Sequence, residues 1–181
     1  MLHHIVFICI LCYTDRLTFK LFQAIQWGIT HEIRGISWYS ALLSQEISAS
    51  GLYLDESGML GASPDGSLNE NELVEVKCPF SAKDCSLSEL ISTKKDFFLR
   101  KVGDIITLNP AHDYYHQIQG GLHLSKAQVC HLIVWTPTEC FVQKILRDPI
   151  WGSNINLLKQ FYCEHFFPNF LCSLTEGTSH S

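Results

Sequence analysis

The sequence predicts an α/β fold in which helices flank a central mixed β-sheet. Ile25, Ile29, Ile33 and Ile36 recur at the spacing of one helix face, which predicts a helix over residues 24–43. Short runs rich in β-branched and apolar residues then alternate with turn residues and with further helical stretches. This order of helices and strands is typical of a sheet with helices packed on it.

Two short strands, a turn and a longer strand are expected after the first helix. These segments cover residues 51–55, 59–62, 63–66 and 73–77. The turn contains Pro, Asp and Gly, residues that favour tight turns. Pro79 ends the longer strand, because proline cannot donate a ladder hydrogen bond.

The second half of the chain predicts three more helices, a hairpin and two neighbouring strands. The expected elements are a helix over residues 86–98, a hairpin arm over 103–108, a helix over 110–124, strands over 129–135 and 140–146, and a terminal helix over 150–167. The first of these strands is apolar throughout, which is typical of a strand covered on both faces. The terminal helix is expected to pack on the sheet.

The chain length of 181 residues fits one domain, expected over residues 24–172, between an apolar N-terminal segment (1–23) and a polar tail (173–181). Hydrophobic residues make up 46% of the chain, enough for a substantial core. The net charge of −5 differs from the strongly basic character of a passive nucleic-acid binder. It does not exclude an enzyme that acts on nucleic acid, because metal-binding carboxylates add negative charge.

The cysteines and the N-terminal segment predict an intracellular protein without a membrane anchor. The eight cysteines are scattered, and most are expected to be reduced, buried thiols. Cys9 and Cys12 form a CxxC pair without the second pair that a zinc site needs. Residues 5–11 resemble a short signal-peptide core, but no Lys or Arg precedes them and no clear cleavage site follows. Secretion is therefore the disfavoured alternative, and the apolar run is too short to span a bilayer.

The strongest chemical pattern joins a turn to the strand that follows it. Side chains alternate across a strand, so Glu75 and Lys77 share one face while Val74 and Val76 share the other. Asp65 lies in the preceding turn, from which a hairpin can bring it to the same place. Two carboxylates suit Mg²⁺, with Mn²⁺ as a substitute, and the backbone carbonyl of Val76 is a further candidate ligand. Lys77 would orient a water molecule and stabilise charge on a phosphoryl group.

A simpler interpretation of the same residues is a solvated surface. Glu75 and Lys77 would then form an exposed pair, and Asp65 would only form the turn. The E-x-K pattern occurs by chance in many proteins, whereas the whole string with Pro-Asp-Gly before it is more specific.

Three longer motifs resemble the YqaJ viral recombinase domain family. They are GASPDG at residues 61–66, LVEVKCPF at 73–80 and YYHQIQG at 114–120, and the resemblance extends over most of residues 28–171. This family includes phage lambda exonuclease and belongs to the PD-(D/E)XK superfamily. The chain is particularly similar to versions found in animal genomes, often linked to mobile elements. The resemblance therefore implies a restriction-endonuclease-like core.

Residue by residue, the resemblance implies a complete set of site residues. Asp65 and Glu75 match the metal ligands of the family and Lys77 matches its catalytic lysine. Residues 28–32 match the first helix motif, whose Glu32 is expected beside the metals. Two residues of the helix over residues 110–124 complete the set, namely Gln117 as a catalytic residue and Tyr114 as a substrate contact.

The function that the resemblance implies is Mg²⁺-dependent hydrolysis of DNA, as an exonuclease running 5′ to 3′ from duplex ends. The implied partners are duplex ends or single strands of DNA, other copies of the chain and a recombination protein. The nucleus is the expected compartment in a eukaryotic host. The alternative is an inactive, mobile-element-derived remnant that binds DNA or protein, since only Arg16 and Lys20 stand where the family carries basic residues for the DNA end.

Two further groups of residues each allow two interpretations, one functional and one structural. A basic stretch is expected to contact DNA phosphates, or else to be a solvated helix end; its members are Lys94, Lys95, Arg100 and Lys101. His31 and His116 adjoin motif residues, but helix neighbours point in different directions. They are expected to be structural histidines rather than metal ligands.

Overall fold

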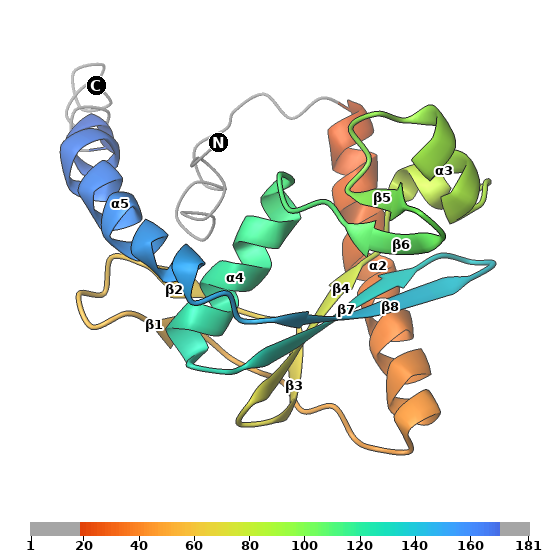
Figure 1. Cartoon of the computed structure of the whole chain (residues 1–181), viewed down its shortest axis with the longest axis horizontal. Helices are drawn as coiled ribbons and strands as arrows, with labels where there is room; N and C mark the ends of the chain where they lie inside the picture. The colour runs from red at the N-terminus through yellow and green to blue at the C-terminus, as the bar shows by residue number, and fades with distance from the viewer. Residues whose placement is uncertain (1–18, 171–181) are drawn as a thin grey trace, which may run out of the picture.

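The computed structural model describes residues 19–170 (Figure 1). Its elements in chain order are α2 (Phe19–Leu43), β1 (Tyr53–Leu54), β2 (Gly61–Ala62), β3 (Gly66–Asn69), β4 (Glu72–Lys77), η1 (Phe80–Ala82), α3 (Leu87–Thr93), β5 (Leu99–Val102), β6 (Ile105–Leu108), α4 (Asp113–Ser125), β7 (Val129–Trp135), β8 (Cys140–Leu146), η2 (Ile150–Ser153), α5 (Asn154–Phe161) and η3 (Tyr162–Phe166). The predictions for the signal-like run at residues 5–11, for Cys9, Cys12, Arg16 and Cys172, and for the tail lie outside the described residues.

The central sheet has four strands in the order β3-β4-β7-β8. Strands β4 and β7 run parallel, while β3 and β8 pair antiparallel with their neighbours. The sheet is therefore mixed, as predicted. The bounds of β7 and β8 match the predicted strands, because both are long apolar or alternating runs that end at clear turn residues.

Helices α2 and α4 cover opposite faces of this sheet (Figure 1). On the α2 face, Tyr39 packs with Val74 and Val76 of β4. On the α4 face, Ile118 and Leu122 join the larger core cluster. All five inner residues of β7 are buried, so the prediction of a strand covered on both faces is confirmed.

Strand β3 is the element that the sequence did not indicate. Residues 63–66 were predicted as a turn, and the segment after them carried no strand pattern. In the structure, Gly66 begins β3 and pairs with Val74 of β4. A β-carbon on Gly66 would stand 2.6 Å from Cγ2 of Ile47, so only glycine fits here without a shift. Pairing with β4, rather than local propensity, makes this segment a strand.

The helix predicted over residues 86–98 is wrong in its second half. Ser86 caps α3 by accepting a hydrogen bond from the backbone N–H of Glu89, and the helix ends at Thr93. Phe97, Phe98 and Leu99 are buried one after another. Successive residues of a helix point in different directions, so an irregular or extended backbone buries such a run better. The hairpin that follows is also longer than predicted and spans β5 and β6.

The C-terminal helical segment forms, but the prediction that it packs on the sheet is wrong. It consists of η2, α5 and the π-helical η3. Trp151 and Leu158 pack with Leu60 beside the β1–β2 hairpin, away from β4 and β7. Lys159 Nζ and Asp55 Oδ2 form an ion pair at 2.6 Å that joins α5 to the same region. Within residues 19–170, no helix is both long and apolar enough to span a membrane.

Candidate active site

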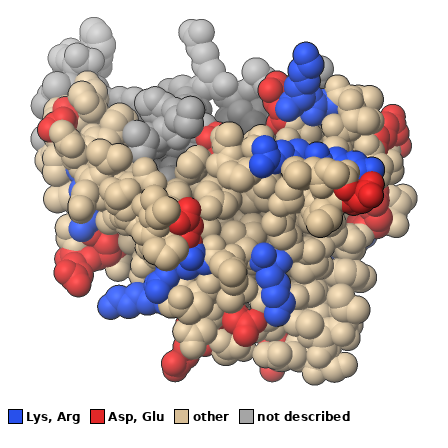
Figure 2. Space-filling view, viewed as in Figure 1, with Lys and Arg blue, Asp and Glu red and all other residues tan. Residues whose placement is uncertain are grey.

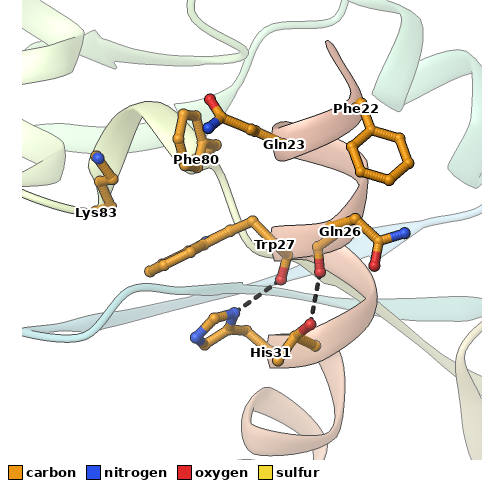
Figure 3. Close-up of a pocket in the computed structure, with 8 residues that line it drawn as sticks. Phe22, Gln23, Gln26, Trp27, His31, Phe80 and Lys83 are labelled. Carbon is orange, nitrogen blue, oxygen red and sulfur yellow. Dashed lines mark hydrogen bonds between the residues drawn. The ribbon is translucent and has the colours of Figure 1, made fainter. Parts of the chain in front are cut away.

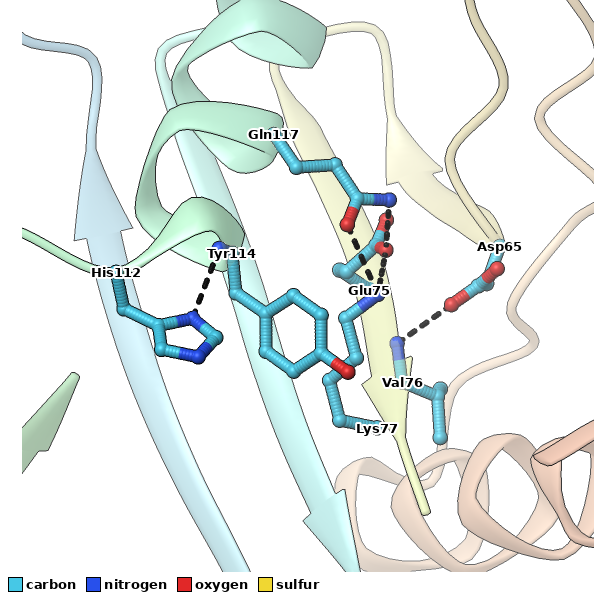
Figure 4. A network of polar contacts seen from close by, with 7 residues as sticks. All are labelled: Asp65, Glu75, Val76, Lys77, His112, Tyr114 and Gln117. Atoms are coloured by element: carbon cyan, nitrogen blue, oxygen red, sulfur yellow. Dashed lines mark hydrogen bonds and ion pairs between the residues drawn. The ribbon is translucent and has the colours of Figure 1, made fainter. Parts of the chain in front are cut away.

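The carboxyl end of β4 carries a buried ion pair. Glu75 and Lys77 project from the same face of the strand, toward α4 (Figure 4). Lys77 Nζ donates a hydrogen bond to Glu75 Oε1 at 2.7 Å. The side chain of Lys77 is only 16% exposed and that of Glu75 only 8%. The interpretation of these residues as a solvated surface pair is therefore wrong.

Helix α4 closes this pair from above. Gln117 Nε2 donates to Glu75 Oε1 at 2.8 Å, and Gln117 Oε1 accepts from Lys77 Nζ at 3.1 Å. The ammonium of Lys77 also lies 4.4 Å from the ring centroid of Tyr114, within cation–π range. Glu75, Lys77 and Gln117 thus form a closed triangle of hydrogen bonds.

The first turn of α4 is set by a histidine, His112, whose role was not predicted. The helix starts at Asp113, later than the predicted Pro110, because His112 is its N-cap. His112 Nδ1 accepts from the backbone N–H of Tyr114 at 3.1 Å, and the two rings meet edge to face. Histidine is not among the usual N-cap residues Ser, Thr, Asp and Asn, so no pattern in the sequence indicated this cap.

At the edge of β4, the side chain of Asp65 makes a hydrogen bond that a neighbouring strand would otherwise make. Its Oδ2 accepts from the backbone N–H of Val76 at 2.6 Å (Figure 4). The ladder with β3 begins only at Gly66 and Val74, so this N–H has no strand partner on that side. The N–H and C=O of one strand residue point to the same edge. The carbonyl of Val76 therefore faces the same edge of β4 as Asp65.

The electrostatics of the site follow from burying several charges together. Burial, and next the charge of Glu75, raise the pKa of Asp65 to about 7. Burial is the largest single influence on Lys77 and by itself would lower its pKa. The charge and hydrogen bond of Glu75, together with Tyr114 and the charge of Asp65, outweigh burial and raise this pKa above its usual value. Lys77 is therefore an ammonium ion at neutral pH. Any positive charge added near Asp65 would stabilise its ionised form.

Glu32 approaches the same cluster from α2 on the other side of β4. Its side chain is half-buried, and burial followed by the charge of Glu75 raises its pKa. The charge of Glu32 in turn helps to raise the pKa of Asp65. The structure thus brings together all five residues expected to be catalytic, from two helices, a strand and a turn.

The donor chemistry of this cluster fits a hard divalent cation. Asp65 and Glu75 each have one carboxylate oxygen without a hydrogen bond to another described residue. Within residues 19–170, no three His, Cys, Asp or Glu side chains are grouped closely enough to hold a metal ion by themselves. A Mg²⁺ ion usually keeps several waters and needs only one or two carboxylates, so two carboxylates with a backbone carbonyl suffice.

The four basic residues lie apart from this cluster. Lys94 and Lys95 follow α3, while Arg100 and Lys101 lie on β5, and all four are exposed. Figure 2 shows blue side chains over α3, β5 and β6 at the upper right, with red ones among them. In the described part of the chain, no hydrogen bond or ion pair joins any of the four to Glu75 or Lys77.

The two motif histidines have structural roles, as predicted. His31 is stacked between Trp27 and Trp135, with ring centroids 3.8 and 5.2 Å away, and its Nδ1 lies 2.8 Å from the carbonyl of Trp27. His116 Nδ1 accepts a hydrogen bond from the indole N–H of Trp151 at 2.9 Å.

A buried polar chain behind the site was not predicted. Tyr39 Oη lies 2.6 Å from His131 Nδ1, and His131 Nε2 lies 2.7 Å from Glu72 Oε2. Tyr39 belongs to α2 and the other two residues to neighbouring strands, so these hydrogen-bonded side chains join α2 to the sheet. His131 lies within an apolar run, where the sequence carries no sign of its partners.

The fold and the site define a PD-(D/E)XK-like α/β protein, in which Pro64 and Asp65 precede the Glu75-Val76-Lys77 strand. A family model of the YqaJ-like viral recombinase domain matches residues 3–128. The chain therefore belongs to this family, and the expected fold is confirmed. A comparison with curated protein sequences gives no match.

Solved structures of two exonucleases are similar in fold to this chain. An alkaline exonuclease (LHK-Exo) from Laribacter hongkongensis has a TM-score of 0.62 and 21% identity, covering 91% of this chain and 80% of the other. The complex of the same exonuclease with dAMP gives a TM-score of 0.63, with 21% identity and the same coverage. A phage-related exonuclease from Haemophilus somnus 129PT has a TM-score of 0.59 and 12% identity, covering 93% and 82%.

Proposed function

We propose that this protein is a Mg²⁺-dependent DNA nuclease that removes nucleotides from duplex ends in the 5′ to 3′ direction. Membership of the YqaJ-like family and the shared fold with alkaline exonucleases support the reaction class. The observation that carries the proposal is the buried Glu75–Lys77 ion pair with Asp65 beside it. Burying three charges in one place costs stability, and such arrangements are concentrated at functional sites.

Lys77 would supply positive charge to the reacting phosphodiester. Its raised pKa keeps it protonated, so it serves as a cation and not as a general base. Its ammonium has three N–H donors, of which Glu75 and Gln117 engage two. The third can bind a phosphoryl oxygen, on which negative charge grows as the attacking water adds to phosphorus.

Gln117 and Tyr114 would position this lysine. Lys77 donates hydrogen bonds to Gln117 and to Glu75, so it cannot move away without breaking both. The amide of Gln117 also donates to Glu75 and thus holds the other member of the ion pair. The ring of Tyr114 lies against the ammonium and limits its approach from that side. A charge held in place before the reaction stabilises the transition state more than a mobile one.

Asp65, Glu75 and the carbonyl of Val76 would hold the Mg²⁺ ion. When present, such an ion neutralises phosphate charge and activates water as the nucleophile. The charge of Glu32 raises the pKa of Asp65, and the charge of Glu75 raises the pKa of Glu32, so Glu32 lies close to both carboxylates and would hold a water molecule. The closeness of these carboxylates is destabilising without added positive charge, which favours cation binding.

The test is degradation of linear duplex DNA labelled at one end. Wild-type protein with Mg²⁺ should degrade the DNA, and EDTA should stop it. Lys77→Ala should remove the activity, whereas the control Lys144→Ala, an exposed lysine on β8, should keep it. Early release of a 5′ label, with a 3′ label retained on shortened strands, is the pattern expected for the proposed polarity.

Two other outcomes would overturn parts of the proposal. Folded wild-type protein that leaves the DNA intact, yet binds it equally well in EDTA, would identify a binding-only relative. Degradation that starts from the 3′ label would keep the nuclease and reverse its direction.

A further inference from the structure

A hollow of about 480 Å³ lies between α2 and η1 (Figure 3). This size is typical of sites that take a small organic group, roughly 300–1,000 Å³. We call it the Trp27 groove. Among the described residues it is lined by Phe22, Gln23, Gln26, Trp27, Thr30, His31, Phe80 and Lys83.

The groove is built from the two segments that also carry the active site. Trp27 and His31 precede Glu32 on α2, and Phe80 follows Lys77 closely, after β4 has ended. None of the five residues assigned to catalysis lines the groove. The groove is thus separate from the active site, but the chain segments that line it also carry Glu32 and lead on from Lys77.

The aromatic side of the groove is held firmly. Trp27 meets Phe80 edge to face with centroids 5.9 Å apart, and it stacks on His31 at 3.8 Å. His31 in turn stacks on Trp135 of the central sheet. A flat apolar group that enters the groove therefore meets ring surfaces that are already fixed in position. Stacking on such surfaces suits any nucleobase, since every base has a π-face.

The polar side of the groove offers donors, acceptors and one positive charge. Gln23 and Gln26 are exposed, and neither side-chain amide has a hydrogen-bond partner within residues 19–170. Each amide provides two N–H donors and one acceptor oxygen. Figure 3 shows Gln23 pointing toward Phe80. Lys83 Nζ lies 4.9 Å from the ring centroid of Phe80 and 3.4 Å from Asp84 Oδ2.

We propose that the Trp27 groove holds an unpaired nucleobase of the DNA strand, next to the phosphodiester that the active site cleaves. The base would stack on the ring of Phe80 and meet the ring of Trp27 at its edge, because the two ring planes are inclined at 70°. The edge of the base would meet the amides of Gln23 and Gln26, and Lys83 would contact the adjoining phosphate. The adjacency to cleavage rests on the proposed nuclease function, whereas the binding itself does not.

This assignment explains why the groove combines flat apolar walls with uncommitted amides. A base inside a duplex is covered on both faces and paired along its edge, so it cannot enter. A base at a frayed end or in a single strand can enter. Since the contacts are stacking and adaptable amides, the groove would accept any of the four bases.

The test is the binding of a fluorescently labelled single-stranded oligonucleotide in EDTA, followed by anisotropy. A series of oligonucleotides carries one abasic nucleotide at each position in turn. One position should weaken binding to wild-type protein about 5- to 100-fold, as expected for the loss of one stacked base. Phe80→Leu and Gln26→Ala should reduce this positional effect, and Phe167→Leu, an exposed aromatic on the C-terminal helix, should leave it unchanged.

The abasic series uses wild-type protein, so it decides the proposal whether or not a variant folds. Equal binding of every abasic oligonucleotide would overturn the base-binding groove. Cleavage of duplex DNA in Mg²⁺, measured separately, keeps the two proposals distinct. Cleavage without a positional effect overturns the groove alone, and a positional effect without cleavage overturns the nuclease alone.

Discussion

Gly35 lies so close to β4 that a β-carbon built on it would stand 2.6 Å from Cγ1 of Val76. Helix α2 rests on the sheet at this point, about one turn beyond Glu32. The contact therefore sets how near Glu32 comes to the carboxylates of β4.

Gly35→Ala should both destabilise the protein and lower its activity. Alanine favours a helix over glycine by about 1 kcal/mol, but overpacking against Val76 costs about 1–3 kcal/mol and moves α2 outward. Urea unfolding and DNA cleavage measure the two effects. Gly28→Ala is the matched control on the same helix, since an added β-carbon there meets nothing within 4 Å. Equal effects of the two substitutions would contradict the close contact.

Asp65→Asn should stabilise the metal-free protein at high pH. Folding raises the pKa of Asp65 from 3.8 to about 7, so the folded protein keeps a proton that the unfolded chain releases. Stability therefore falls as pH rises through this interval. Asparagine can still accept from the N–H of Val76 and does not ionise. We expect a gain of roughly 1–4 kcal/mol at pH 8, since each pH unit by which folding raises a pKa corresponds to about 1.4 kcal/mol.

Urea unfolding in EDTA at pH 5 and pH 8 measures this difference. The gain from Asp65→Asn should be smaller at pH 5, where the wild-type carboxyl is mostly protonated in the folded state. A gain that does not depend on pH would show that the charge of Asp65 is not its cause.

Gln117→Leu should slow DNA cleavage about 10- to 100-fold, the usual loss when a residue that orients a metal ligand is removed. Leucine keeps the size of the side chain but frees both Glu75 and Lys77 from it. Single-turnover cleavage at saturating DNA measures the rate. Gln128→Leu, an exposed position beyond α4, should cleave at the wild-type rate. An unchanged rate in Gln117→Leu would exclude a positioning role.

Replacing the basic stretch with glutamine should weaken DNA binding and reduce its dependence on salt. Each phosphate contact contributes about 0.9 to the slope of log K against log salt concentration. The combined variant Lys94→Gln, Lys95→Gln, Arg100→Gln and Lys101→Gln should therefore give a flatter slope in a salt titration. A double control, Lys126→Gln with Lys144→Gln, removes charge elsewhere. An unchanged slope would leave the stretch as a solvated surface.

The parts of the fold that could be predicted are those with a local cause. The alternation of Val74, Glu75, Val76 and Lys77 assigned the two faces of β4 correctly, because side-chain direction in a strand depends only on position. The apolar run of β7 likewise showed that both of its faces are covered.

The parts that could not be predicted depend on contacts between distant segments. No local pattern shows that Gln117 spans Glu75 and Lys77, or that Tyr39 meets His131. Trp151 and Leu158 carry a helical pattern, but a pattern does not say which surface they will cover. The family resemblance implied a role for Gln117 beside Glu75 and Lys77. Neither the sequence pattern nor the resemblance indicated the contact of Tyr39 with His131 or the surface that Trp151 and Leu158 cover.

The parallel pairing of β4 with β7 has a consequence for how the protein is made. Glu75 and Gln117 are 42 residues apart in sequence, and α4 forms the crossover between the two strands. Contacts between such distant segments form late, because a long loop must close before any contact rewards it. During synthesis, β4 leaves the ribosome with Leu73 uncovered on the face opposite α2 until α4 has followed, and without its parallel partner strand until β7 has followed. Early folding is therefore a period of aggregation risk, and a chain that stops before β7 would lack the strand that completes the sheet behind Glu75, Lys77 and Gln117.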